Sequence, residues 1–418
     1  YQGVADPCVD IYALGAMIHH LLSKRDPQLE PPFSFHERPI REANPNVSGE
    51  LLEVVDRALK YEATDRYGSA AEMRRALANL RSARGARGTS VFAAQPVAGG
   101  TIVPNWRFSL EDEIRSSPTV HKEIVYVGAY DHNLYALDAD DGSFLWKYAA
   151  EGGIASSPCV YEGIVFVGSV DRILYAVDAS DGRIRWTCPT EGKIWSSPQA
   201  AFHHVFFGSD DRHLYAVNVD SGRIAWKFEA EGRVRSSPRI GDDAIYVGCE
   251  AGVVYAVDTG GDALWRFRAR RSVTSSPAVT DEMVYVGSQD RYVYGLDARS
   301  GWLVWRYRTE GPIISSPTVG RGLVYIGSAD GHLYALRAES GRLVWRYGTD
   351  GQVTSSPALL ERKVYFGSVD GGIYALDAEG GDLLWRYQTN GPITSSPATT
   401  NEMVYVGSFD RCLYALPA

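Results

Sequence analysis

Serine and tryptophan recur with a period of about forty residues through the last three-quarters of this 418-residue chain. The tripeptide SSP recurs at steps of 40 residues, with one step of 39, and begins at Ser116, Ser156, Ser196, Ser236, Ser275, Ser315, Ser355 and Ser395. One tryptophan per repeat keeps the same spacing, from Trp106 to Trp385. A fixed period of this length is typical of proteins built from repeated supersecondary units.

Each repeat contains four β-type segments. Typical segments are SSPAV, VYVGS, LYALD and LVWRY, in which apolar and polar residues alternate between turns of Gly, Asp and Ser. The DG and SG pairs between the third and fourth segments suit tight hairpins. Four hairpin-linked strands in about 40 residues form the blade of a β-propeller. A solenoid is the alternative, but antiparallel hairpins favour radial closure.

The ends of the repeat region predict how the ring closes. The last repeat stops at LYALPA and so lacks its fourth strand, whereas a lone fourth-strand sequence, PNWRFSL, stands at 104–110 before the first SSP. If this strand completes the last blade, the ring has eight blades and no free edge, which removes the liability of an unpaired strand. The repeated tryptophans are expected to pack between neighbouring blades.

The run ALDADDGSFLW resembles the tryptophan-docking repeat of the pyrroloquinoline quinone (PQQ) family, A-x-D-x-x-[TSD]-G-x-x-x-W. The resemblance covers residues 104–418 and implies a mainly β fold, an eight-bladed PQQ-like propeller. Related repeats occur in quinoprotein alcohol dehydrogenases, in an outer-membrane assembly lipoprotein and in propellers fused to signalling domains. The dehydrogenases typically carry an adjacent-cysteine disulfide and a calcium site. Neither pattern is present in the sequence, so PQQ is not expected as a cofactor.

Composition narrows the class of protein. Hydrophobic residues make up 45% and charged residues 22%, as in ordinary soluble domains. The net charge of −9 argues against nucleic acid as a partner, and no apolar run reaches the length of a membrane span. The five cysteines show no CxxC pair and are interpreted as reduced thiols of a cytoplasmic protein. The acidic hairpin DADDG varies between repeats and is interpreted as a turn, so no metal site is expected.

The first eighty residues differ from the rest and are predicted to be helical. A first helix spans 10–22, and apolar residues are predicted to share one of its faces: Ile11, Leu14, Ile18, Leu21 and Leu22. A second helix spans 49–60 with Ser48 as its N-cap. A third begins at Ser69, which forms a capping box with Glu72, and runs to about Leu80.

Two motifs in this helical part resemble those of bacterial Hanks-type serine/threonine kinases. DIYALG, from Asp10 to Gly15, resembles the D-x-[WY]-S-x-G segment that begins the central helix of the kinase C-lobe, and DRYGSAAEM with Arg66 resembles the arginine segment near the kinase C-terminus. The resemblance covers residues 1–80. It implies that Asp10 braces the catalytic loop and that Arg66 pairs with the glutamate of an A-P-E segment.

The same resemblance places the kinase catalytic machinery outside this chain. The Gly-rich loop, the ATP-positioning lysine, the H-R-D loop and the D-F-G metal site are absent from the 418 residues. The chain is therefore interpreted as a C-terminal fragment with no catalytic residue of its own, and ATP and Mg²⁺ are expected only for a longer parent. The alternative is a short helical cap on a propeller.

The predicted domain order is a truncated kinase C-lobe at 1–80, a flexible linker at 81–103 and the propeller at 104–418. The linker is rich in Arg, Gly, Ala and Ser, which suits a flexible tether. It contains no membrane helix, so both domains are expected in the cytoplasm.

Two positions vary from repeat to repeat and predict a ligand face. These are the residue before SSP and the residue after VGS, which should both lie at one end of the propeller channel. The candidate residues, with two neighbouring arginines, are Arg115, Tyr130, Trp195, Asp210, Arg233, Arg235, Glu250, Arg271 and Gln289. Arginines concentrate around the fourth and fifth repeats, which predicts an anionic small ligand or an acidic protein segment. Random drift at solvent positions, and a solvated charged rim, are the alternatives.

Three functions are consistent with these observations. The favoured one is a propeller that binds, senses or recruits substrate for a serine/threonine kinase in signal transduction by protein phosphorylation. The second is a PQQ-dependent dehydrogenase-like propeller. The third is a non-catalytic scaffold for protein assembly.

Overall fold

The computed structural model describes residues 7–23, 40–44, 47–60, 63–67, 69, 72–73, 76 and 102–418. The chain divides into two compact units, Tyr1–Gln95 and Pro96–Ala418. None of the helices in the described ranges is both long enough and apolar enough to cross a membrane.

The first unit is helical. Its elements are α1 (Pro7–Ser23), α2 (Ile40–Ala43), α3 (Gly49–Ala58) and a 3₁₀ turn, η2 (Ala63–Asp65). The predicted N-cap of α3 is confirmed, because the Ser48 hydroxyl accepts a hydrogen bond from the Leu51 N–H at 3.4 Å. The Ser69 hydroxyl accepts one from the Glu72 N–H at 3.2 Å, as a cap would. Most of the helix predicted after Ser69 lies outside the described residues.

Helix α1 packs through a narrower face than the sequence predicts. Ile11 and Gly15 are buried, and a Cβ added at Gly15 would lie 2.9 Å from the Cβ of Ala58, so this glycine permits close approach to α3. In contrast, Leu14 is 40% and Leu21 68% exposed, so the structure buries only part of the predicted apolar face. Ile18 and Leu22, one and two turns beyond Gly15, also pack against the core of this unit, so the packed face follows residues three and four apart.

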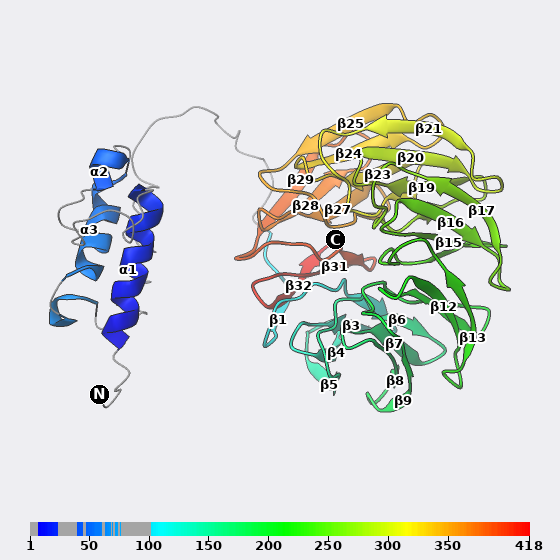
Figure 1. Ribbon diagram of the computed structural model, residues 1–418, viewed down its shortest axis with the longest axis horizontal. Helices are drawn as coiled ribbons and strands as arrows, with labels where there is room; N and C mark the ends of the chain where they lie inside the picture. The colour runs from blue at the N-terminus through cyan, green and yellow to red at the C-terminus, as the bar shows by residue number, and fades with distance from the viewer. Residues whose placement is uncertain are drawn as a thin grey trace. The chain divides into compact units, whose positions relative to one another are not determined.

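The second unit is an eight-bladed β-propeller of eight four-stranded antiparallel sheets, which confirms the predicted fold (Figure 1). The strands of blades 1 to 4 are β2 (Thr119–His121), β3 (Ile124–Gly128), β4 (Asn133–Asp138), β5 (Phe144–Ala149), β6 (Cys159–Tyr161), β7 (Ile164–Gly168), β8 (Ile173–Asp178), β9 (Ile184–Pro189), β10 (Gln199–Ala201), β11 (His204–Gly208), β12 (His213–Asn218), β13 (Ile224–Glu229), β14 (Arg239–Ile240), β15 (Ile245–Gly248), β16 (Val253–Val257) and β17 (Ala263–Arg268). Within each of these blades the strands pair in chain order.

Blades 5 to 8 repeat the same arrangement, except that the fourth strand of blade 8 comes from the start of the unit. Their strands are β18 (Ala278–Val279), β19 (Met283–Gly287), β20 (Tyr292–Asp297), β21 (Leu303–Arg308), β22 (Thr318–Gly320), β23 (Leu323–Gly327), β24 (His332–Arg337), β25 (Leu343–Gly348), β26 (Ala358–Leu360), β27 (Lys363–Gly367), β28 (Gly372–Asp377), β29 (Leu383–Gln388), β30 (Ala398–Thr399), β31 (Met403–Gly407), β32 (Cys412–Pro417) and β1 (Trp106–Ser109).

Ring closure follows the prediction. Strand β1 pairs antiparallel with β32, with Trp106 opposite Ala415 and Ser109 opposite Cys412. Figure 1 shows β1, β32 and β31 side by side although they come from opposite ends of the unit. The Ser109 hydroxyl and the Cys412 thiol lie 3.5 Å apart although 303 positions separate the two residues in the sequence. The last blade is therefore complete, and its outer strand is supplied by the start of the unit.

The SSP tripeptide holds the inner strands together in two ways. The first serine bonds within its blade; the Ser116 hydroxyl donates to the Gly128 carbonyl at 2.7 Å and accepts from the Gly128 N–H at 3.0 Å. The second serine bonds to the next blade, and these bonds form a closed circuit at 2.9 to 3.0 Å through Ser117, Ser157, Ser197, Ser237, Ser276, Ser316, Ser356 and Ser396. The repeated serines are therefore scaffold.

The repeated tryptophans pack between blades, as predicted. Trp106 on β1 donates its indole N–H to the Ala139 carbonyl of blade 1 at 2.9 Å, and Trp305 does the same to Ala338 of blade 6 at 2.7 Å. The glycine of the next hairpin lies against the ring; a Cβ at Gly301 would lie 2.5 Å from Trp265. The G-x-x-x-W spacing thus joins each blade to its neighbour.

An aspartate buried in the turn between the second and third strands collects hydrogen bonds in most blades. In blade 6, Asp330 accepts the Tyr334 hydroxyl at 2.9 Å. It also accepts the backbone N–H groups of Glu310, Gly311 and His332 at 2.9 to 3.0 Å. Burial by itself would raise the pKa of Asp330. The hydrogen bonds to its carboxylate outweigh this effect and hold the pKa below its usual value.

Substitution of Asp330 by Ala should destabilise the propeller by about 2–3 kcal/mol, because several buried donors lose their acceptor. Since the folded pKa is depressed, the stabilisation is present above the unfolded pKa of about 4 and is lost as pH falls through the folded pKa. The difference in melting temperature between wild type and Asp330→Ala, followed by circular dichroism, should therefore be large at pH 7 and shrink below about pH 4. Equal melting temperatures at pH 7 would contradict this role.

Candidate functional site at the channel mouth

The two variable positions of the repeat lie next to one another in every blade. The turn after the second strand is hydrogen-bonded to the loop that precedes the first strand, here called the inbound loop. In blade 1 the Tyr130 N–H donates to the Glu113 carbonyl at 3.1 Å, and in blade 6 the Ala329 N–H donates to Pro312 at 2.9 Å. Because both segments join strands at the same end of each blade, these residues surround one mouth of the channel, here called the mouth face.

The best-connected cluster on the mouth face spans blades 3 and 4. Arg235 holds Asp210 with two parallel hydrogen bonds, Nε to Oδ1 at 2.8 Å and Nη2 to Oδ2 at 2.9 Å. Its Nη1 lies 3.0 Å from Oε1 of Glu250, and its guanidinium lies over the Trp195 ring, 5.6 Å from the centroid. The hydrogen bond to Asp210 is the main cause of a raised pKa for Arg235. All four residues belong to the predicted set.

The charge of this cluster differs from the prediction of an anion site. Arg235 contributes one positive charge against the two carboxylates of Asp210 and Glu250, and its side chain is only 33% exposed. A guanidinium whose donors are already taken by two carboxylates has little left for an incoming anion. Arg235 is therefore engaged in an internal ion-pair network, and an anionic ligand of the arginines around repeats four and five stays a prediction.

Two polar groups beside Arg235 have no partner. The indole N–H of Trp195 and the hydroxyl of Thr274 are buried atoms without a hydrogen bond among residues 102–418. They occupy the position before SSP in blades 3 and 5, on either side of Arg235 in the ring. The Thr354 hydroxyl, at the same position in blade 7, is also without a partner among residues 102–418. A buried polar group without a partner costs free energy unless water or a ligand satisfies it.

A second cluster lies where blades 8 and 1 meet. The guanidinium of Arg115 lies 4.5 Å from the Tyr130 ring centroid and 5.3 Å from that of Phe409. It also donates to Oε1 of Glu113 at 2.6 Å. Phe409 occupies one of the variable positions that the sequence predicted, the residue after VGS. Glu113 was not predicted, because its contact with Arg115 depends on the conformation of the inbound loop.

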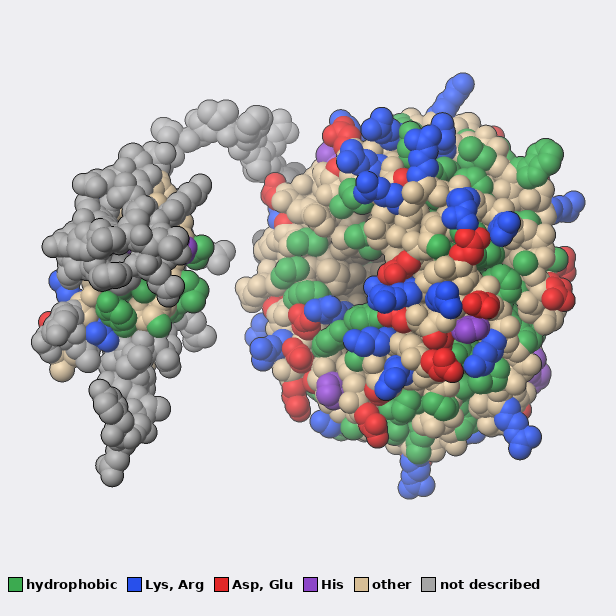
Figure 2. All heavy atoms as spheres, in the orientation of Figure 1, with side chains coloured by type: hydrophobic (Ala, Val, Ile, Leu, Met, Phe, Trp, Pro, Cys, Tyr) green, Lys and Arg blue, Asp and Glu red, His purple; other side chains and the backbone are tan. Residues whose placement is uncertain are grey.

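Among residues 102–418, no side-chain bond joins the remaining predicted residues to either cluster. Arg233 and Arg271 are exposed, and Gln289 is half-buried. They lie on the inbound loops and the turn of blades 4 and 5, where the Gln289 N–H donates to the Ser272 carbonyl at 3.0 Å. Within the described ranges, no three His, Cys, Asp or Glu side chains lie close enough together to hold a metal ion. Figure 2 shows basic and acidic side chains side by side over the propeller surface in view.

The kinase-motif residues lie in the helical unit. Arg66 donates from Nε to the Lys60 carbonyl at 2.7 Å, and its guanidinium lies 4.7 Å from the centre of the Tyr12 ring. Gly15 is in the contact between α1 and α3. The side chain of Asp10 lies outside the described residues.

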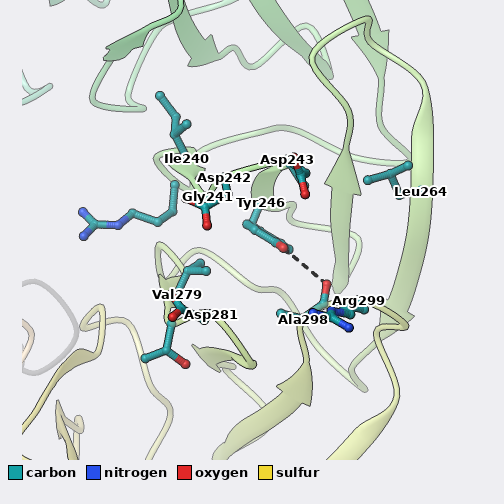
Figure 3. A pocket seen from close by; sticks show the side chains of 13 residues that line it. Ile240, Gly241, Asp242, Asp243, Tyr246, Leu264, Val279, Asp281, Ala298 and Arg299 are labelled. Atoms are coloured by element: carbon teal, nitrogen blue, oxygen red, sulfur yellow. Dashed lines mark hydrogen bonds between the residues drawn. The ribbon is translucent and has the colours of Figure 1, made fainter.

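A cleft between blades 4 and 5 lies away from the mouth, beside the hairpins at the other ends of the strands. Its volume is about 560 Å³, and Asp242, Asp243 and Arg299 line it together with Tyr246, whose hydroxyl donates to the Ala298 carbonyl at 3.3 Å (Figure 3). The equivalent groove between blades 5 and 6 has the same volume. The cleft therefore reflects the repeat geometry more than a dedicated site.

Comparisons with known proteins agree with this architecture. The sequence model of the family described as outer membrane protein assembly factor BamB matches residues 87–203, 160–260, 250–367 and 351–418. A search of the curated proteins gave no match.

Solved structures share the fold at low sequence identity. BamB from Moraxella catarrhalis is 18% identical with a TM-score of 0.67, over 76% of this chain and 100% of that chain. The computationally designed Ika8 protein is 18% identical with a TM-score of 0.68, over 74% and 98% of the two chains. Quinohemoprotein alcohol dehydrogenase from Comamonas testosteroni is 14% identical with a TM-score of 0.66, over 76% of each chain.

Proposed function

The chain belongs to the family of repeat propellers described as outer membrane protein assembly factor BamB, and from this premise we propose that its propeller is a protein-binding module whose ligand docks on the mouth face. The observation that carries the proposal is the asymmetry of that face. Scaffold contacts such as the serine circuit recur in all blades, whereas the cluster of Arg235, Asp210, Glu250 and Trp195 occurs between blades 3 and 4.

The chemistry of this cluster suits recognition of a protein segment. Trp195 supplies a large aromatic surface, and aromatic residues are enriched at the centres of protein interfaces. Its unpartnered N–H and the Thr274 hydroxyl provide hydrogen-bonding groups that a backbone carbonyl or polar side chain of a ligand would satisfy. The guanidinium of Arg235, itself held by Asp210 and Glu250, packs on the Trp195 ring before binding, and such preorganisation lowers the entropic cost of association.

Peptide display against the full chain tests this proposal. We expect enriched peptides to lose at least about tenfold in affinity when Trp195 is replaced by Ala, because the indole donor and a central aromatic surface disappear. Trp302 provides a matched control, since it is the other tryptophan outside the repeat spacing and is 78% exposed. Enrichment of peptides whose affinity falls with Trp302→Ala and not with Trp195→Ala would place the ligand elsewhere.

A quinone-dependent dehydrogenase is the rival function, and the channel-mouth residues fit the quinone poorly. PQQ is a planar polyanion that needs an open aromatic face and unpaired cations. Here Arg235 covers the Trp195 ring and is itself paired with two carboxylates. The four described cysteines, Cys159, Cys188, Cys249 and Cys412, are free thiols. The likeness to a dehydrogenase structure at 14% identity concerns the fold alone.

We also propose that the helical unit is part of a serine/threonine kinase, so that the propeller recruits substrate or a regulator in the cytoplasm. The motif resemblance of DIYALG and DRYGSAAEM supports this. So does an apolar stripe on α1, where Leu14 is 40%, Met17 60% and Leu21 68% exposed. Such a stripe on a helix indicates that more protein packs against it, as catalytic segments would in a kinase C-lobe.

The coding sequence upstream of Tyr1 tests the kinase association. We expect an in-frame segment with a Gly-rich loop, a lysine strand, H-R-D and D-F-G. An unrelated domain in that position would end this part of the proposal and leave the propeller's binding role untouched. ATP and Mg²⁺ would then have no expected place in the protein.

A further inference from the structure

The inbound loop of blade 5 reverses the charge that the other blades carry. Near the start of this loop, the other blades have an acidic residue or an amide: Glu111, Glu151, Glu191, Glu231, Glu310, Asp350 and Asn390. Blade 5 has Arg270 at this position and Arg271 at the next, which is glycine in blades 2, 3, 4, 6, 7 and 8. Because all blades share the same scaffold, the repeat fold does not require these two arginines.

The neighbouring turn of blade 4 lacks the acidic residue that the other turns carry. The aspartate that binds tyrosine is present as Asp131, Asp171, Asp211, Asp290, Asp330, Asp370 and Asp410. Blade 4 has Ala251 instead, and its tyrosine, Tyr255, accepts the Glu231 N–H at 3.1 Å through its hydroxyl. The turn of blade 4 therefore lacks one carboxylate, and the adjacent inbound loop of blade 5 carries two additional guanidinium groups, those of Arg270 and Arg271.

These departures lie together on the mouth face. The Ser272 hydroxyl of blade 5 donates to the Glu250 carbonyl of blade 4 at 2.8 Å, and the Glu250 N–H donates to the Arg233 carbonyl at 2.9 Å. A Cβ at Gly252 would lie 2.7 Å from the Arg271 carbonyl. The two inbound loops and the blade 4 turn are therefore in direct contact, and we call Arg233, Arg270 and Arg271 the basic sector.

The arginines of the basic sector differ from their neighbours in charge pairing. Arg235 is bound by two carboxylates, and Arg266 and Arg268 both pair with Glu231. Arg233, Arg270 and Arg271 are exposed, and none of them forms an ion pair with the residues that the structure describes. The carboxylate of Asp290 accepts the backbone N–H of Arg270 and the Tyr294 hydroxyl, and no ion pair between it and the Arg270 guanidinium occurs among the described residues.

We propose that the basic sector binds a protein segment with clustered carboxylates. Three guanidinium groups offer forked donors that match carboxylates in pairs. The net charge of the chain is −9, so such a segment is repelled over most of the surface and attracted at this place. The proposal rests on the proposed function, because it assigns the chemistry of a ligand for the same mouth face.

Fluorescence anisotropy with the full chain and a labelled deca-glutamate peptide tests the proposal. We expect saturable binding that weakens as salt is raised, since the contacts are exposed ion pairs. The double substitution R270E/R271G restores the Glu-Gly pair found in blades 2, 3, 4 and 6, so it should fold. It should weaken binding at least about tenfold, because two of the three forked donors are lost.

The matched control is the double substitution R299E/R342S, which changes the net charge by the same amount as R270E/R271G but at the hairpins of blades 5 and 6, away from the mouth face. R299E/R342S uses residues that other blades carry at these positions, as in Glu339 and Ser143, and should leave affinity unchanged. Equal loss in both double variants, tight binding of a poly-dT strand at the same sector, or no binding of deca-glutamate would overturn the proposal. Display-selected peptides that still depend on Trp195 would then leave the proposed function standing.

Discussion

A chain of residues 110–418, which lacks β1, should aggregate or melt about 10 °C below a chain of residues 102–418. The loss removes the ladder between β1 and β32 and the hydrogen bond from Trp106 to Ala139. Truncation of a buried tryptophan costs about 3–5 kcal/mol, a large share of the net stability of a domain. The open edge of β32 should also invite association with other chains. Size-exclusion chromatography and thermal unfolding measure both effects.

The substitution Trp146→Ala separates the loss of a tryptophan contact from the loss of the strand pairing between β1 and β32. Trp146 is 8% exposed and donates to the Ala179 carbonyl at 3.2 Å, so it makes the same contact inside the ring while every strand stays paired. We expect this variant to melt lower but remain monomeric. A chain 110–418 that stays as monomeric and as stable as 102–418 would show that β1 contributes little to closure.

Replacement of Gly301 by Val should destabilise the propeller by about 4 kcal/mol through strain and overpacking. Gly301 has φ +71°, a region that L-residues enter at a cost, and its added Cβ would lie 2.5 Å from the Trp265 ring. Trp265 would have to move, and its hydrogen bond to the Ala298 carbonyl, now 2.8 Å, would weaken. Chemical denaturation with fluorescence of the tryptophans measures the change.

Gly322 supplies the control for backbone strain. Its φ is +73°, but nothing lies within 4 Å of an added Cβ. Gly322→Val should therefore cost only about 1–2 kcal/mol. If the two variants lost the same stability, the contact between the hairpin glycine and the tryptophan of the preceding blade would not be a source of inter-blade cohesion.

Local sequence was enough to predict most of the propeller. Alternating segments separated by glycine and aspartate turns specify four strands per repeat, and the number of SSP repeats specifies how many blades there are. The unpaired strand sequence around Trp106 predicted its pairing with the last blade, because a ring has to satisfy the backbone groups of its final strand. The N-cap at Ser48 could also be predicted from the sequence, because it depends on a hydrogen bond between residues only three apart.

The candidate site depended on contacts that sequence spacing does not encode. The sequence placed Arg235, Asp210 and Glu250 on one face, but only the packing of blade 4 on blade 3 brings Asp210 within 2.8 Å of a residue 25 positions later. That contact commits Arg235, one of the predicted arginines, to an internal ion pair. It left the basic sector of blades 4 and 5 as the part of the predicted arginine cluster whose charge is not neutralised among residues 102–418.

Helix α1 shows the same limit. Its periodicity placed five apolar residues on one face. Of these, Ile11, Ile18 and Leu22 pack against the other helices of the unit, whereas Leu14 and Leu21 stay exposed. Which part of an apolar face is covered depends on the neighbour's position, and that is a tertiary property. The sequence by itself determined strands, turns, caps and the closure of the ring, because each follows from local or periodic patterns. Tertiary structure alone decided which charges are neutralised and which apolar side chains stay exposed, because those depend on distances between segments.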